Sequence, residues 1–289
     1  MNKFYQKQLL KYSRKDLIAS CILFENNLYL QSIYMFQQSV EKAVKNYGLL
    51  TGIVSINDLQ WKIGHNPIKL FEIFLHFNEK NVKRLENARK DKIIGKANFF
   101  QDFDMSKGFE NFHKAKQEIN KLKKTEVQKN KNLLIDIFNN LLDINRGIER
   151  LKKTSLKAEF IRNCFDKGLE YSKDLLQRLS PFNAKKIKLE IDYFMKKEVS
   201  KNKTIRKVAK LLRLLLFAIM IEQALIHLSV LVIKLDTRLR YPSDSNSLLN
   251  TLTKKDTFIR MLPDFQDQLL LIINHLEKFN FQLALVKTP

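Results

Sequence analysis

The sequence contains very little glycine and proline, with 7 Gly and 5 Pro in 289 residues. Sheet proteins need many tight turns, and those turns depend largely on these two residue types. Runs in which apolar and polar residues alternate, the pattern of half-buried strands, are also nearly absent. The shortage predicts an all-α fold of long helices, and the 45% of hydrophobic residues are enough to form its core.

Cysteine is scarcer still, because Cys21 and Cys164 are the only two and both fall within helical patterns. This count argues against a disulfide framework or a cysteine-rich metal site, and we interpret both residues as small buried hydrophobic side chains. Such cysteine usage is typical of a reducing compartment and predicts a cytoplasmic protein. The sequence also lacks a paired-His motif and a Gly-rich phosphate loop, so it predicts no metal and no cofactor.

An uninterrupted apolar run of membrane-spanning length is missing as well. The most apolar stretch, 211–235, carries charged residues near its centre, where each would cost a few kcal/mol in a bilayer. Within and just after it, Gln223, His227, Lys234 and Arg238 recur on one helical side. The pattern predicts a central bundle helix with one polar stripe, and no membrane span.

Positive charge is abundant, since 52 Lys and Arg against 30 Asp and Glu give a net charge of +22. Such an excess favours a polyanionic partner, namely nucleic acid or, less well, an anionic membrane surface. Lysine far outnumbers arginine, however, and a protein that recognises bases or binds phosphates through paired hydrogen bonds usually relies more on arginine. Compositional drift towards Lys, Asn, Ile and Phe is therefore the alternative explanation of the charge.

Residues 14–47 hold the clearest helical patterns of the chain. Residues 1–13 are predicted to be a helical lead-in. The first helix is predicted to begin near Ser13 or Asp16, which resemble a capping box, and a polar break follows at 25–27. The second is predicted over 29–49, with apolar residues at spacings of three and four. These are Ile33, Phe36, Val40, Val44 and Tyr47. Asn66 and Pro67 then suit the start of a third helix.

The middle of the chain differs in composition. Between 79 and 204 basic residues outnumber acidic ones about two to one and the apolar stripes are thinner, which predicts a basic helical insertion of two or three helices. An apolar helix then follows over 205–238, and a last pair of helices over 247–262 and 265–284. The predicted domains are thus a discontinuous bundle of 1–78 plus 205–289, and an insertion at 79–204.

Three motifs together resemble the HEPN family of helical bundle proteins. Residues 38–45 read QSVEKAVK and are similar to the family's QAxEKAxK pattern. Gly64-His65, followed by Leu70, is similar to the start of the family's third helix, and Arg240-Tyr241-Pro242 stands where its core helix usually ends. The resemblance covers about 14–78 and 205–285 and does not include the insertion.

The resemblance implies an up-and-down helical bundle that forms a homodimer. It also implies either metal-independent RNA cleavage or non-catalytic binding of RNA or nucleotide, in toxin–antitoxin, abortive-infection or phage-defence systems. A nucleotidyltransferase or an antitoxin is the protein partner that it implies. Cleavage in the family relies on an Arg followed four to six residues later by a His, and no His of this chain has that spacing. Whether the protein is an endoribonuclease therefore stays open.

The candidate residues follow from these motifs. The predicted catalytic residues are His65, His227 and Arg240, and the predicted RNA- or nucleotide-binding residues are Lys42, Lys45, Arg238, Arg240 and Tyr241. Each also has a purely structural interpretation. Glu41 and Lys45 could form a solvated helical pair, His65 a backbone-bonded residue at a helix start, His227 a buried hydrogen-bonded residue, and Arg240 a cation at a helix C-terminus.

Two other functions remain open at this stage. One is a non-catalytic helical protein that binds another protein, such as a regulatory or antitoxin-like subunit whose positive charge meets an acidic partner. The other is peripheral attachment to an anionic membrane. Aromatic residues near 99–112, within the Lys-rich insertion, could stack on single-stranded RNA or could belong to the core.

Overall fold

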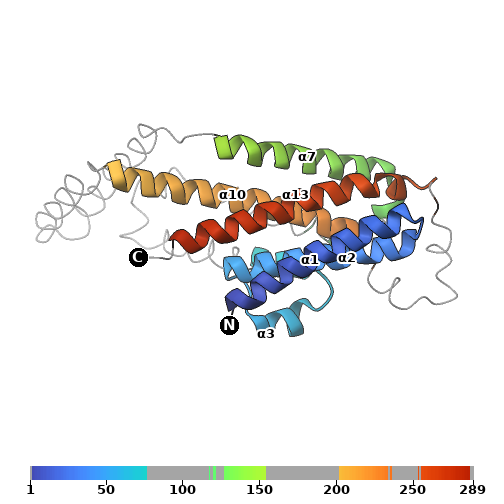
Figure 1. Ribbon diagram of the computed structural model, residues 1–289, viewed down its shortest axis with the longest axis horizontal. Helices are drawn as coiled ribbons and strands as arrows, with labels where there is room; N and C mark the ends of the chain where they lie inside the picture. Colours follow the sequence, from blue (N-terminus) through green and yellow to red (C-terminus); the bar gives the residue numbers. More distant parts are fainter. Residues whose placement is uncertain are drawn as a thin grey trace, which may run out of the picture. The chain divides into compact units, whose positions relative to one another are not determined.

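The computed structural model describes residues 2–76, 127–153, 202–233 and 255–286, together with 117, 120, 121, 235 and 253. Every element within these residues is a helix, which confirms the predicted all-α bundle (Figure 1). The elements are α1 (Asn2–Glu25), α2 (Tyr29–Thr51), α3 (Ile56–Asp58), the π-helical turn η1 (Leu59–Ile63), η3 (Val127–Lys129), α7 (Lys131–Lys153), α10 (Asn202–Val232) and α13 (Thr257–Val286). Residues 68–76 are also helical.

The chain divides into two compact units. The first combines Met1–Phe74, Lys116–Lys152 and Phe217–Pro289, and the second combines Leu75–Ala115 and Lys153–Leu216. Our division into a bundle and an insertion at 79–204 stays a prediction. It did not anticipate that 116–152, and with it most of α7, groups with α1, α2 and α13. Every site described below lies within the first unit.

Helices α1 and α2 pack antiparallel through two pairs of serines that exchange hydrogen bonds. Ser13 Oγ donates to the Ser39 carbonyl oxygen at 2.8 Å and Ser39 Oγ donates to the Ser13 carbonyl at 2.7 Å. Ser20 and Ser32 form the same reciprocal pair, at 2.7 Å in both directions. All four residues are fully buried. Because these side chains are small and internally satisfied, the two backbones can approach closely without orphaned polar groups.

This packing corrects the predicted start of the first helix. α1 begins at Asn2 and not near Ser13 or Asp16. Ser13 lies in the middle of the helix, where its hydroxyl bonds to α2 instead of capping α1. The two residues do have the spacing of a capping box. A helix interior can hold the same residues when a neighbouring helix accepts a hydrogen bond from the serine hydroxyl.

The apolar stripe of α2 forms the centre of the first unit. Ile33, Phe36, Val40 and Val44 are all completely buried, as their spacing predicted. Burying a side chain of this size contributes about 1.5–3 kcal/mol, so the four together contribute roughly 6–12 kcal/mol towards holding α2 in the core. Gly52 ends α2 in the left-handed conformation at φ 75°, where its N–H bonds to the Leu49 carbonyl.

Helices α7 and α13 run parallel and side by side. The rings of Phe138 and Phe265 meet edge to face with centroids 5.9 Å apart. Further along both helices, Asn145 Nδ2 donates to Gln268 Oε1 at 2.6 Å. The contacts keep a nearly constant sequence offset, which is the signature of two parallel helices in register. The predicted stripe of α7 is confirmed at Leu134, Ile137 and Leu141, which are buried.

The predicted pair of helices at 247–262 and 265–284 is wrong at its junction. α13 continues from Thr257 to Val286 with Pro263 inside it. Proline removes one backbone donor and its ring crowds the carbonyl four residues earlier. The helix persists because Phe258, Leu262 and Phe265 on both sides of the proline are completely buried. Tertiary packing therefore overrides the local preference for a break.

Helix α10 joins the core of the first unit through its C-terminal half. Ile221, Leu225 and Leu228 are completely buried, and Gln223 is exposed. This distribution agrees with the predicted apolar bundle helix. Within the described part of the chain, no helix combines the length and the hydropathy that a membrane span requires.

Candidate functional site

The candidate site is centred on Glu41, in the C-terminal half of α2. Its side chain is only 5% exposed, yet it is a carboxylate. Lys45 Nζ lies 2.6 Å from Glu41 Oε1, and His65 Nδ1 lies 3.2 Å from Oε1 and 3.3 Å from Oε2. The Glu41–Lys45 pair of the sequence analysis therefore exists, but its carboxylate is buried and not solvated. We call Glu41, Lys45 and His65 the Glu41 cluster.

The short segment after α2 holds His65 in place. Ser55 and Asp58 form a capping box at α3, with Ser55 Oγ accepting from the Asp58 N–H and Asp58 Oδ2 accepting from the Ser55 N–H. After the turn η1, Gly64 adopts a positive φ of 54°. Asn66 Oδ1 then accepts from the N–H of residue 68 at 3.2 Å, as expected for the start of a helix. His65 lies between these two anchors, so its backbone is constrained on both sides.

The imidazole of His65 bridges the buried carboxylate and the surface. Its side chain is 52% exposed, in contrast to 5% for Glu41. Because Nδ1 faces Glu41, Nε2 lies on the opposite edge of the ring. A carboxylate accepts a proton and cannot donate one when ionised, so the proton is assigned to Nδ1 and Nε2 becomes the basic nitrogen. This arrangement can accept a proton or hydrogen bond at Nε2 and, once protonated, can donate one.

The two predicted binding lysines are engaged within the first unit. Lys45 pairs with Glu41, and Lys42 pairs with Asp16 on α1. The side chains of Lys42 and Asp16 are 25% and 20% exposed. Both ammonium groups are thus partly neutralised by a nearby carboxylate, and a role for Lys42 and Lys45 in ligand binding stays a prediction.

The other predicted residues do not join His65 in the described structure. His227 is part of α10, and its Nδ1 donates to the Gln223 carbonyl oxygen of the same helix at 2.7 Å. That bond matches the structural interpretation of a hydrogen-bonded histidine, although His227 is only half-buried. Arg238, Arg240 and Tyr241 lie outside the described residues.

One polar residue near the cluster was missed by sequence reasoning. Gln37 is completely buried, and neither its side-chain oxygen nor its nitrogen has a hydrogen-bond partner. It precedes Glu41 by four residues, as Glu41 precedes Lys45, so the three follow one side of α2. This spacing was visible in the sequence, but only the fold reveals that the side they occupy is buried.

A second buried acidic residue connects α2 and α10. Tyr47 Oη donates to Glu222 Oε2 at 3.0 Å. Burial raises the pKa of Glu222 to about 7, and the hydrogen bond from Tyr47 offsets only part of that effect. Burial and the nearby carboxylate together raise the pKa of Tyr47 well above its ordinary value. Both groups therefore favour their neutral forms at neutral pH or below.

Residues 6–93 match the family model of the HEPN domain. All three residues of the Glu41 cluster lie within this segment, as do α2 and most of α1. No curated protein and no solved structure matches the chain. Among the residues that the structure describes, no group of three His, Cys, Asp or Glu could hold a metal ion. The resemblance to the HEPN family is thus confirmed for residues 6–93, whereas the resemblance over 205–285 stays a prediction.

Proposed function

We propose that this HEPN-domain protein engages RNA at the surface around His65. The observation that carries the proposal is a half-exposed imidazole whose Nδ1 lies 3.2 Å from a buried carboxylate within the HEPN segment. The net charge of +22 supports a polyanionic partner over a neutral one.

The burial of Glu41 is difficult to explain by stability alone. Taking a carboxylate and an ammonium out of water costs several kcal/mol per ion, and their attraction often only balances that cost. An apolar residue at position 41 would pack against the completely buried Val40 and Val44 stripe without that cost. A buried charge that fixes the orientation of an exposed ring is more consistent with a binding role for the ring.

The chemistry available at His65 suits a ribose-phosphate backbone. Nε2 can accept a hydrogen bond from a ribose 2′-hydroxyl, and the protonated ring can donate one to a phosphate oxygen. The chain lacks the Arg–His spacing on which cleavage in the family relies. We therefore propose binding and not cleavage by the usual family chemistry. A toxin–antitoxin or phage-defence system is the setting that the family implies for this activity.

RNA binding is tested with a fluorescently labelled single strand of about 20 nucleotides, long enough to cover the surface of a small domain. The affinity of the wild-type protein should fall steeply as salt rises from about 50 to 200 mM, because bound phosphates release counterions. His65→Ala should weaken binding by about tenfold, equivalent to the loss of one charge-assisted hydrogen bond. Glu41→Gln should weaken it less, because the amide still accepts from Nδ1.

Arg260→Ala is the matched control, since Arg260 is an exposed cation at the start of α13 and outside the HEPN segment. It should change the affinity by less than about twofold. The proposal fails if the wild-type protein does not bind RNA at low salt. The assignment to His65 fails if His65→Ala and Arg260→Ala weaken binding equally.

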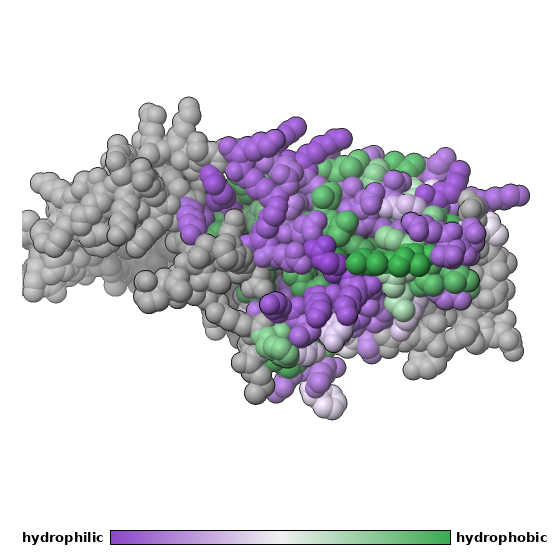
Figure 2. Space-filling model, in the orientation of Figure 1, coloured by the Kyte–Doolittle hydropathy of each residue, from purple (hydrophilic) through white to green (hydrophobic). Residues whose placement is uncertain are grey.

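A homodimer is the second part of the proposal, and exposed apolar side chains favour it. Ile18 and Ile22 are each 53% exposed on α1, and Leu270 and Leu271 are 36% and 41% exposed on α13. Figure 2 shows hydrophobic side chains gathered on the face that displays these helices. Exposed apolar side chains that gather on one face mark an interaction surface more often than chance. A second copy of the chain is the occupant that the HEPN family implies.

A further inference from the structure

The outer face of the N-terminal half of α1 carries aromatic side chains that are exposed to solvent. Phe4 is 71% exposed, Tyr12 49% and Tyr5 37%. The inner face of the same turns is buried, since Gln6 and Leu10 are only 8% and 4% exposed. The packing of α1 in the bundle therefore leaves these rings uncovered. Aromatic residues grouped on one face in this way indicate an interaction surface, which exposed side chains scattered singly do not.

Lysines lie among these rings on the same face of α1. Lys7 and Lys11 follow Phe4 at helical spacings of three and four residues, and both are exposed. The ammonium of Lys15 lies 6.0 Å from the centre of the Tyr12 ring. Residues 2–15 contain five Lys or Arg and no Asp or Glu. The outer face of this half of α1 is thus positively charged as well as aromatic.

The only tryptophan of the chain lies at the same end of the first unit. Trp61 belongs to η1 and is 86% exposed, and the side chain of Lys62 is 66% exposed. Gln6 Nε2 donates to the Leu49 carbonyl oxygen at 3.0 Å, which ties the first turns of α1 to the last turn of α2, a few residues before η1. Figure 1 shows the N-terminus beside α3, which directly precedes η1. What we call the aromatic–basic surface consists of Phe4, Tyr5, Lys7, Lys11, Tyr12, Trp61 and Lys62.

This combination of side chains matches the interface of a bilayer that contains anionic lipids. Tryptophan and tyrosine prefer the boundary between headgroups and acyl chains, where the ring is in apolar surroundings and its polar atom stays hydrated. Lysine can lay its methylene groups along the apolar layer while its ammonium reaches the headgroups. Apolar insertion and attraction to anionic lipid therefore act together on such a helix face.

The degree of exposure favours a lipid surface over a shaped partner. Phe4 and Trp61, at 71% and 86% exposed, project from the protein and do not line a depression. Single-stranded nucleic acid is typically held in a groove with stacking rings, and a protein partner needs a pocket that fits each anchoring side chain. A fluid lipid layer accepts projecting rings without a complementary shape. The use of lysine instead of arginine also suits a diffuse anionic surface, which offers no fixed fork of acceptors.

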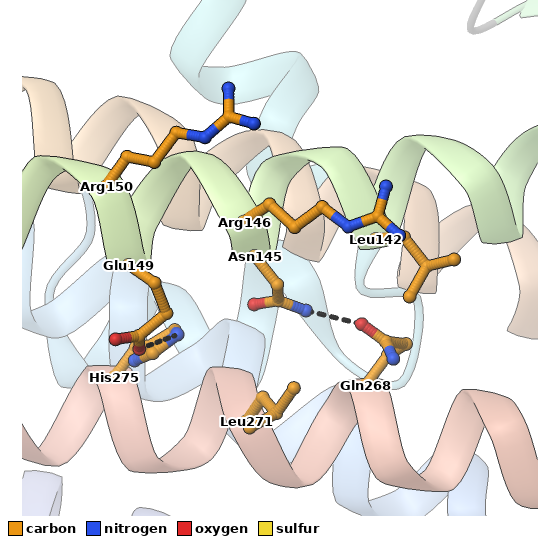
Figure 3. A pocket seen from close by; sticks show the side chains of 8 residues that line it. All are labelled: Leu142, Asn145, Arg146, Glu149, Arg150, Gln268, Leu271 and His275. Atoms are coloured by element: carbon orange, nitrogen blue, oxygen red, sulfur yellow. Dashed lines mark hydrogen bonds and ion pairs between the residues drawn. The ribbon is translucent and has the colours of Figure 1, made fainter.

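A second positively charged surface provides the comparison. An open cavity of about 340 Å³ is lined by α7 and α13, with Asn145, Arg146, Arg150 and His275 among its residues (Figure 3). Among the described residues that line it, none is Phe, Tyr or Trp. Figure 1 shows α7 on the other side of α13 from α1. Attraction through charge alone would act at both surfaces, whereas aromatic rings can insert only at the aromatic–basic surface.

We propose that the aromatic–basic surface attaches the protein to a membrane that contains anionic phospholipids. Phe4 and Trp61 insert at the level of the headgroups, and Lys7 and Lys11 lie against the lipid phosphates. The surface shares no residue with the Glu41 cluster or with the exposed apolar residues of α1 and α13 assigned to the dimer. Membrane attachment therefore does not depend on RNA binding at His65.

The test is sedimentation of the full chain with vesicles of phosphatidylcholine, either alone or with about one third of phosphatidylglycerol. At about 0.1 M salt, the wild-type protein should bind the anionic vesicles at least about tenfold more tightly than the neutral ones. Because Trp61 is the only tryptophan, its fluorescence reports on this surface. On binding, its emission should shift to shorter wavelength and should be protected from acrylamide, a quencher dissolved in the water.

Two double variants separate attraction by charge from insertion of the rings. Lys7→Glu with Lys11→Glu should weaken binding to the anionic vesicles at least about tenfold, because two attractive charges become repulsive. Phe4→Ser with Trp61→Ser should also weaken it at least about tenfold, because the inserted apolar area is lost. All four side chains are exposed, so both variants should keep the circular dichroism spectrum of the wild type.

Lys131→Glu with Arg146→Glu is the matched control. Both side chains are exposed on α7, and the pair reverses the same number of charges as the lysine variant of α1. It should change binding by less than about twofold. The proposal is overturned if the anionic vesicles do not bind the wild-type protein, if neutral vesicles bind it equally well, or if the control weakens binding as much as the lysine variant. It is also overturned if the serine variant binds like the wild type, or if acrylamide quenches Trp61 equally in the bound and free protein.

Discussion

Glu222 and His275 should give the protein two opposite dependences of stability on pH. The folded state raises the pKa of Glu222 from 4.5 to about 7, so this group stabilises the fold below pH 4.5 and the contribution is lost as the pH rises to 7. It lowers the pKa of His275 from 6.5 to about 4, so this group stabilises the fold above pH 6.5 and the contribution is lost as the pH falls to 4.

The two contributions are similar in size. Each shift is about 2.5 pKa units, and at 1.36 kcal/mol per unit the ceiling is about 3.4 kcal/mol for each group. Solvent and side-chain relaxation reduce such values, and we expect roughly 1–2 kcal/mol from each. Because the two windows overlap and the signs are opposite, these contributions nearly cancel between pH 5 and 7 in the wild-type protein.

Single substitutions should expose each contribution separately. Glu222→Gln keeps an acceptor for Tyr47 and removes the titrating carboxyl group. As the pH rises from 5 to 8, the unfolding free energy of this variant should therefore increase by roughly 1–2 kcal/mol relative to that of the wild type. Over the same rise in pH, the unfolding free energy of His275→Gln should decrease by a similar amount relative to the wild type. The double variant should show nearly the same dependence of unfolding free energy on pH as the wild type. The assay is urea unfolding followed by circular dichroism at constant ionic strength.

The relevant quantity is the difference in unfolding free energy between a variant and the wild type at each pH. In this difference the contributions of all other titrating groups cancel. Lys152, Glu149 and Lys278 also act on His275, and they remain in every variant. The reasoning would be refuted if the difference in unfolding free energy between Glu222→Gln and wild type were the same at pH 5 and pH 8. It would also be refuted if the two single variants changed the slope in the same direction.

Two further predictions concern α13 and the apolar surface. Pro263→Ala restores a backbone donor inside α13 and should stabilise the protein by about 1–3 kcal/mol in urea unfolding, whereas a lower stability would mean that the helix is built around the proline. Replacing both Ile18 and Ile22 by glutamate should convert a homodimer to a monomer in light scattering with an unchanged helical spectrum. A wild-type protein that is already monomeric at about 100 μM would remove the dimer from the proposal.

The sequence predicted well those features that depend on one helix at a time. Ile33, Phe36, Val40 and Val44 were assigned to the core from their spacing, and all four are completely buried. Spacing determines which side of a helix a residue occupies, and a wide apolar side must be covered. The scarcity of glycine and proline likewise indicated the all-α fold, because long helices need few turns.

Features that depend on a partner helix were not predictable in the same way. Glu41 looked like a solvated residue because its burial depends on a fold that brings up His65, which follows 24 residues later. His275 gave no signal, because its cavity requires α7, which was assigned to the insertion. Pro263 indicated a helix end, and only the buried aromatic residues around it explain why α13 continues. In each case a tertiary contact overrides or adds to a local preference.

The buried polar residues of the first unit fall into two groups with different consequences. The pairs Ser13–Ser39 and Ser20–Ser32 are fully satisfied, and they fix the register of α1 on α2 because a shift of one residue would orphan all four hydroxyls. Asn145 leaves one buried acceptor unpaired, beside an open cavity that α7 and α13 line. Satisfied groups specify the fold, whereas unsatisfied ones cost stability that the folded chain alone does not recover. Unpaired side-chain atoms of this kind lie both beside the cavity and on α2, where Gln37 and Asn46 are completely buried, so the cost is spread over two parts of the core.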